Sequence, residues 1–179
     1  LNDGKGARTV ELNDDEHLLI RELNLLTSKP LIYAYNVDES DARLHDESVL
    51  AISAKIEAEI SELDPAEAAE YLQTLGLSTS GLNRLIRRAY EALDLITYFT
   101  SGDTETRAWT IKRHTKAPQA AGAIHTDFEK GFIRAEVINW KDFVDAGGEA
   151  GARDRGLLRL EGKEYVFQDG DTTHFRFSV

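Results

Sequence analysis

The sequence has no cysteine and no methionine, only three prolines and no long apolar run. Without cysteine, disulfides and thiolate metal sites are both excluded, which suits a reducing compartment. No stretch approaches the roughly 20 apolar residues of a membrane span, and the first five residues do not resemble a signal peptide. The scarcity of proline and the 30% of charged residues argue against disorder. Because natural chains begin with methionine, we expect a processed product, a fragment or a partial record.

Length and charge indicate two small domains rather than one large one. The chain has 179 residues, of which 41% are hydrophobic, enough for real cores. Nearly all of the net charge of −11 lies in residues 1–97, whereas residues 98–179 are close to neutral. The acidic first part should repel phosphate backbones, and a local basic face could exist in the second part. We therefore predict domains at 1–97 and 98–179.

Residues 1–97 carry signals for helices and short strands. Capping-box sequences at 13–16 and 64–67 predict helix starts, and the first helix should run to a stop at 28–30. Ser80 opens a further helix with one apolar face. The apolar runs 31–35 and 49–52 predict two buried parallel strands next to these helices, which is typical of an α/β domain.

Residues 98–179 mix strands and helices, which predicts a small α+β domain. A strand is expected at 96–100, where the two parts meet, with a turn at 101–103. The other predicted strands are 107–111, 132–139 and 157–160, and the predicted helices are 118–128 and 140–146. Residues 164–167 and 172–179 are expected to pair as a hairpin across the Asp-Gly turn at 168–171.

Polar loops follow both predicted strands of the first domain. Asn36-Val37-Asp38-Glu39 comes after the first strand and Ser53-Ala54-Lys55 after the second. Each sequence is common by itself and fits an ordinary polar loop. Ligands of open α/β sheets bind at the carboxyl ends of the strands, so the two loops together indicate a binding site.

The segment 125–134, His-Thr-Asp-Phe-Glu-Lys-Gly-Phe-Ile-Arg, closely resembles the C-terminal TGS domain of the YchF/Obg-like ATPase family, which belongs to the P-loop GTPase superfamily. The resemblance covers nearly the whole chain. It implies an α/β partial P-loop nucleotide-binding domain at 1–97, followed by an α+β β-grasp (TGS, ubiquitin-like) domain at 98–179.

The same resemblance gives the two loops a role. In P-loop GTPases the loops after these strands grip the nucleotide base, and the first normally reads Asn-Lys-x-Asp. The Asn-x-x-Glu found here resembles the YchF pattern, which goes with a preference for ATP over GTP, because the longer carboxylate cannot keep its two hydrogen bonds to guanine. The implied base-binding residues are Asn36, Val37, Glu39, Ser53 and Ala54.

The phosphate-binding half of such a site is missing from the chain. It contains no Gly-x-x-x-x-Gly-Lys-Ser/Thr loop, so we expect no ATP hydrolysis by this polypeptide alone. The resemblance implies that the intact parent is a cytoplasmic, monomeric, ribosome-associated protein that binds ATP, with GTP possible, and uses Mg²⁺ held by residues outside this chain. No membrane partner is implied. The alternative is a non-catalytic β-grasp adaptor that binds ribosomal RNA or protein.

A basic run lies in the second domain. We name Lys112, Arg113, Lys116, Lys130 and Arg134 as candidate RNA-phosphate contacts, with Arg153, Arg155 and Arg159 as possible additions. A solvated face balanced by nearby acids would show the same pattern, and both interpretations stay open.

Two further features carry expectations. His125, Asp127 and Glu129 invite a metal or acid–base interpretation, but a helix end makes them diverge, so we favour local backbone contacts. The stretch after Asp38 up to Ser48 is short for a crossover between parallel strands. We therefore predict a chain break or an unusually tight connection there.

Overall fold

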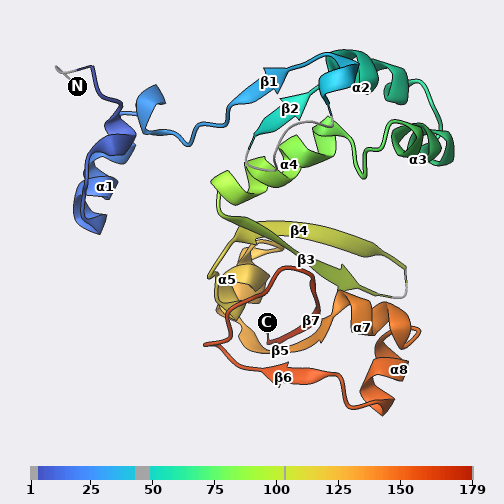
Figure 1. Ribbon diagram of the computed structural model, residues 1–179. Helices are drawn as coiled ribbons and strands as arrows, with labels where there is room; N and C mark the ends of the chain where they lie inside the picture. Colours follow the sequence, from blue (N-terminus) through green and yellow to red (C-terminus); the bar gives the residue numbers. More distant parts are fainter. Residues whose placement is uncertain (1–3, 43–48, 103, 179) are drawn as a thin grey trace. The chain divides into compact units, whose positions relative to one another are not determined.

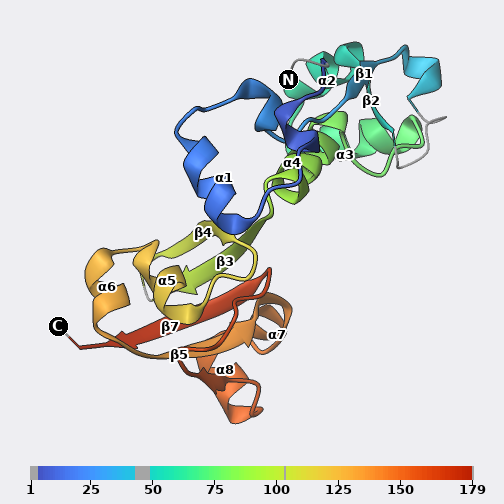
Figure 2. The same cartoon turned by 90° about the vertical axis from the view of Figure 1, so that its left-hand side faces the viewer.

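The computed structural model describes residues 4–42, 49–102 and 104–178 and divides the chain into two compact units, Leu1–Leu93 and Asp94–Val179. We treat each unit by itself. Within the described ranges, none of the helices has both the length and the apolar character needed to cross a membrane. Figures 1 and 2 show the elements of both units.

The first unit has a two-stranded sheet and helices. Its strands are β1 (Ala34–Asn36) and β2 (Leu50–Ile52), and its α-helices are α1 (Asp14–Arg21), α2 (Ala54–Ser61), α3 (Pro65–Thr74) and α4 (Gly81–Ala92). Short 3₁₀ turns lie at Ala7–Thr9, Leu26–Ser28 and Glu39–Asp41.

The two strands run parallel, as predicted, with Ala34 opposite Leu50 and Asn36 opposite Ile52. The expected position and burial of the first strand were wrong. It begins at Ala34 rather than residue 31, and its three residues are exposed, whereas Leu50 and Ala51 of β2 are buried. Within the described residues β1 has β2 as its single strand neighbour, so its other edge is unpaired.

The capping signals found three of the helix starts. Asn13 and Glu16 form the capping box of α1, and Asp64 accepts hydrogen bonds from two N–H groups at the start of α3. The Ser80 hydroxyl accepts from the Asn83 N–H at the start of α4. The Glu57 carboxylate of α2 also accepts from the first N–H groups of α4, at 2.6 Å from Gly81, and so ties the two helices together.

The expected length of the first helix was wrong. Helix α1 ends at Arg21, because Asn24 adopts a left-handed conformation with φ of 46°. Most leucines of the expected longer helix are exposed, for example Leu19 and Leu26 at 77% and 80%.

The second unit is an α/β unit with a five-stranded mixed sheet in the order β4-β3-β7-β5-β6. Its strands are β3 (Leu95–Ser101), β4 (Thr106–Lys112), β5 (Phe132–Asn139), β6 (Arg159–Glu161) and β7 (Asp171–Phe177). Its helices are α5 (Ala117–Gly122), α6 (Thr126–Lys130), α7 (Trp140–Asp145) and α8 (Glu149–Asp154). Strand β7 runs parallel to β3 and antiparallel to β5, and Figure 2 shows it in the middle of the sheet.

A single apolar core holds this unit together. Tyr98 and Phe167 are fully buried, with ring centroids 5.0 Å apart, and both contact the ring of Phe175. Helix α5 packs on this side of the sheet, where the Tyr98 hydroxyl donates to the Ala120 carbonyl at 2.8 Å. Burial raises the pKa of Tyr98, which keeps its hydroxyl a donor.

Two expectations for this unit were wrong. Residues 164–167 and 172–179 do not form a hairpin, because β7 pairs with β5 and β3, and the segment before it makes one isolated bridge, from Val166 to Lys116. The helix expected at 118–128 is two helices, broken by the extended backbone of His125. Helix α8 was not predicted at all. The predicted tight connection between Asp38 and Ser48 falls largely on residues 43–48, outside the described residues.

Candidate functional site

The two predicted loops meet at the carboxyl ends of β1 and β2. The side-chain oxygen Oδ1 of Asn36 accepts a hydrogen bond from the Ala54 N–H at 3.2 Å. The next residue, Val37, donates its N–H to the Ile52 carbonyl at 3.0 Å, which extends the strand pairing by one step. The parallel register therefore fixes both loops at one edge of the sheet, and the Asn36 side chain joins them.

An open pocket of about 420 Å³ lies between these loops, lined by residues 36–40 and 53–55. All five residues named from the sequence line it. Ser53 is buried and precedes the first turn of α2, whose free N–H groups create a partial positive charge. The Ala54 N–H already donates to the Asn36 side chain. A ligand acceptor in this pocket would either displace Asn36 from this N–H or share the N–H with it.

Polar and charged side chains connect the pocket lining to α2 and α3. The Lys55 ammonium lies 2.9 Å from Oε1 of Glu39 and 3.8 Å from Oε1 of Glu59. Glu59 in turn accepts a short hydrogen bond from the Tyr71 hydroxyl of α3. The pKa of Lys55 is raised, and the hydrogen bond to Glu39 is the largest cause. The pKa of Tyr71 is also raised, mainly by its hydrogen bond to Glu59. Lys55 therefore stays charged and faces two carboxylates.

The pairing of Lys55 with Glu39 was missed by sequence reasoning. Lys55 was noted as part of the Ser-Ala-Lys motif but was not named as a site residue. Its spacing of four from Glu59 is a signal for an ion pair on one helix face, and it could have drawn attention to the ammonium. The contact with Glu39 joins residues far apart in the sequence and needed the structure.

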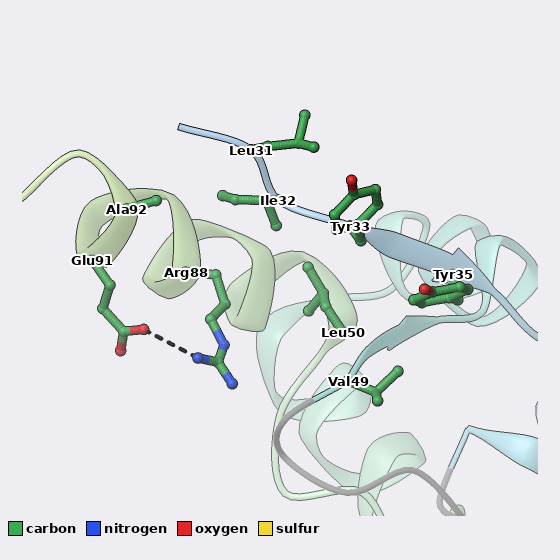
Figure 3. Close-up of a pocket in the computed structure, with 9 residues that line it drawn as sticks. All are labelled: Leu31, Ile32, Tyr33, Tyr35, Val49, Leu50, Arg88, Glu91 and Ala92. Carbon is green, nitrogen blue, oxygen red and sulfur yellow. Dashed lines mark ion pairs between the residues drawn. The ribbon is translucent and has the colours of Figure 1, made fainter. Parts of the chain in front are cut away.

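A larger pocket, of about 550 Å³, lies on the side of β1 and β2 that faces α4 (Figure 3). It is lined mainly by apolar and aromatic side chains, including Leu31, Tyr33 and Tyr35, and has one ion pair, between Arg88 and Glu91 at 3.5 Å. It contains none of the residues named from the sequence. The loop pocket has more converging polar groups, so it is the better candidate for a ligand with a defined polar edge.

The candidate phosphate contacts of the second unit are not gathered into one free patch. Arg113 pairs with Asp94 at 3.1 Å, and Lys116 pairs with Glu164 at 2.6 Å. Lys112 ends β4, and Lys130 lies in the last turn of α6. The pairing of Arg113 and Lys116 with acids lowers the local positive charge that the sequence suggested.

Arginines gather instead around Glu136, whose side chain is 7% exposed. Arg176 donates to both of its carboxylate oxygens at 3.1 Å, and Arg134 and Arg153 lie 3.7 and 3.6 Å away. The hydrogen bonds from Arg176, first of all, lower the pKa of the Glu136 carboxyl. Sequence reasoning named Arg134 and Arg153 but missed Arg176, which lies opposite Arg134 across the antiparallel β5–β7 pair.

His125, Asp127 and Glu129 do not form a metal site. Within the described residues no group of three or more His, Cys, Asp or Glu side chains could hold a metal ion. Nδ1 of His125 accepts a hydrogen bond from the Asp127 N–H at 3.2 Å and so caps α6. The preferred interpretation, local backbone contacts, fits this geometry for His125.

Known proteins resemble both units. Residues 95–178 match the family model YchF-GTPase_C, described as a protein of unknown function (DUF933). The chain is 47% identical to the ribosome-binding ATPase YchF of Bacillus subtilis, over 98% of this chain and 52% of that protein. It is 49% identical to the protein of the same name from Pasteurella multocida, over 96% of this chain and 51% of that protein.

A solved structure agrees with these matches. The YchF GTPase of Schizosaccharomyces pombe superimposes with a TM-score of 0.81 at 35% identity, covering 98% of this chain and 50% of that one. The solved and curated relatives are named as a GTPase and as ATPases. The matches place this chain in the YchF/Obg-like family, as the C-terminal portion of such a protein. The chain spans about half the length of the curated relatives it matches.

Proposed function

We propose that the chain is the C-terminal portion of a ribosome-binding, translation-linked ATPase of the YchF type, cytoplasmic and monomeric. Residues 1–97 would be the second half of its nucleotide-binding domain, and residues 98–179 its β-grasp TGS domain. The observation that carries the proposal is the hydrogen bond from the Ala54 N–H to Asn36, which brings the two predicted base loops to one pocket. The relatives are named ribosome-binding ATPase YchF, and this name supports both the proposed ribosome binding and the proposed ATPase activity.

The pocket offers groups suited to a purine edge. The Asn36 amide and the backbone at Val37 would position the base, Glu39 would accept from its exocyclic amino group, and the N–H groups at Ser53 and Ala54 would face its acceptors. Adenine presents one donor, the N6 amino group, beside the N1 acceptor, whereas guanine presents the N1–H and the N2 amino group together. The base would be adenine, with guanine as the weaker ligand.

Residues outside this chain would supply the phosphate loop and the Mg²⁺ ligands. No cluster of acids or histidines suited to a metal occurs in the ranges 4–42, 49–102 and 104–178. The proposed role of this polypeptide is recognition of the base.

Calorimetric titration of the full-length protein with ATP, GTP and ADP tests this function. We expect ATP to bind at least about tenfold, or about 1.4 kcal/mol, more tightly than GTP. Replacing Asn36 by Ala should weaken binding of all three nucleotides, and Asn83→Ala, on the exposed side of α4, should leave it unchanged. Full-length protein that binds no nucleotide would contradict the base site.

The arginine cluster around Glu136 favours a second candidate, a non-catalytic adaptor that contacts ribosomal RNA. Arg134 and Arg153 are about half exposed and held near a buried carboxylate, so their guanidinium groups are preorganised for phosphate oxygens. Lys112, Arg113, Lys116 and Lys130 would be separate contacts elsewhere on this unit. An RNA contact by itself is compatible with the ATPase, whereas full-length protein that binds RNA and no nucleotide would favour the adaptor.

Ribosome co-sedimentation at several salt concentrations separates the two basic sets. Changing Arg134 and Arg153 to Glu should reduce binding at low salt more than changing Lys112, Arg113 and Lys116 to Glu. Three arginines, Arg134, Arg153 and Arg176, share the two acids Glu136 and Glu149, whereas Arg113 and Lys116 each pair with an acid of their own. Binding that does not depend on salt, or that neither variant changes, would reject an electrostatic RNA contact.

A further inference from the structure

Glu39 is not a free carboxylate. Its Oε1 lies 2.9 Å from the Lys55 ammonium, and the two side chains come from different loops of the same pocket. The Glu39 side chain is 37% exposed, so its other oxygen can reach a ligand. When Glu39 contacts a base, one of its carboxylate oxygens is therefore already bound to the Lys55 ammonium.

Lys55 has a second acidic neighbour. Glu59 lies one turn further along α2, 3.8 Å from the ammonium, and the Tyr71 hydroxyl donates to Glu59. This arrangement places the ammonium between two carboxylates, and the tyrosine fixes the second of them. The raised pKa of Lys55 agrees with an ammonium that stays charged.

We propose that Lys55 is a specificity-determining residue of the base pocket: by occupying one oxygen of Glu39, it leaves a single strong acceptor, which suits the one amino group of adenine and not the two adjacent donors of guanine. This inference rests on the proposed function. A guanine edge needs both carboxylate oxygens, since its N1–H and N2 amino group point in the same direction. An adenine edge needs one, and a second free oxygen would face the N1 lone pair of adenine and repel it.

The size of the effect follows from the exposure of the pair. An exposed ion pair contributes modestly, up to about fivefold in an equilibrium constant. The length of the Glu39 side chain would therefore set the main preference for ATP, and Lys55 would sharpen it. Without the ammonium, GTP should gain affinity and ATP should lose some, because the freed oxygen of Glu39 would face the N1 lone pair of adenine.

Competition binding of ATP and GTP to the full-length protein tests this role. In Lys55→Met, which keeps the apolar stem, we expect the ratio of ATP to GTP affinity to fall by about threefold to fivefold, through tighter GTP binding together with weaker ATP binding. Lys55→Arg keeps a cation near Glu39 and should retain the ratio. Glu59→Gln leaves the 2.9 Å contact in place and should also retain it. Lys29→Met, an exposed lysine of the same unit outside the pocket, is the matched control.

The possible results separate this inference from the proposed function. If wild-type full-length protein binds neither nucleotide, the base site itself fails. If both bind and Lys55→Met leaves their ratio unchanged, or weakens both equally, the specificity role of Lys55 is wrong while the base site stands. Circular dichroism of each variant establishes that the fold is retained.

Discussion

The two units differ in how many of their large apolar side chains they bury. Residues 94–179 close a five-stranded sheet around one aromatic core, with Tyr98, Val137 and Phe167 fully buried. Residues 1–93 build a sheet of two short strands, and most of the exposed large apolar side chains of the described residues belong to this unit. The second unit therefore has a buried core that can stabilise it alone. The first unit holds the candidate pocket on a two-stranded sheet with few large buried side chains.

Separating the units should give the largest effect. We expect residues 94–179 alone to unfold in one cooperative thermal transition, because their core is complete within the unit. Residues 1–93 alone should show little cooperativity, since they bury few large side chains. Circular dichroism melts of the two fragments check this. A cooperative transition in residues 1–93 would remove the contrast between the units.

Removing a single apolar side chain should lower the free energy of unfolding much more in the second unit than in the first. Phe167→Ala deletes a ring that is 1% exposed and contacts Tyr98 and Phe175, so it should lower the free energy of unfolding by about 3–5 kcal/mol. Tyr33→Ala, at a position 69% exposed, should change it by less than about 0.5 kcal/mol. Chemical denaturation of both variants measures the difference, and equal losses would contradict the burial argument.

Acid should weaken the second unit through Glu136. Arg176 lowers the pKa of this carboxyl in the folded state, so the unfolded chain binds the proton first. The stabilisation is present above the usual glutamate pKa of 4.5 and is lost as the pH falls through the lowered value.

A glutamine variant isolates this contribution. Glu136→Gln should cost about 1–3 kcal/mol at pH 7, from the lost charged hydrogen bonds, and the difference from wild type should shrink as the pH falls below 4.5. Urea denaturation at several pH values tests it. A difference that stays constant over this range would show that the carboxylate charge is not the cause.

Local signals in the sequence were enough for most elements. The capping residues Asn13, Asp64 and Ser80 marked helix starts that the structure contains, because a cap acts on groups within three residues. Strand β5 begins and ends at the predicted residues 132 and 139. The strand ends also placed the two loops of the pocket together, since parallel pairing brings carboxyl ends to one edge.

The errors came where distant contacts override local preference. The Asp-Gly turn predicted a hairpin, but the Gly170 N–H donates to Thr97 and the Asp169 carboxylate accepts from the Thr97 N–H, so the turn is tied to β3. Asp171 is buried and accepts from the Tyr165 hydroxyl at 2.6 Å. The contact between Lys55 and Glu39 and the cluster around Glu136 join separate elements in the same way. No short sequence window contains such information.

Photolabelling of the full-length protein with 8-azido-ATP tests the central claim most directly, because the reactive group sits on the base itself. The account predicts that the label, mapped by peptide mass spectrometry, attaches within residues 36–40 or 53–55, and that excess ATP prevents it more effectively than excess GTP. Labelling confined to residues 94–179, or labelling that excess ATP does not prevent, would contradict a base pocket at the ends of β1 and β2.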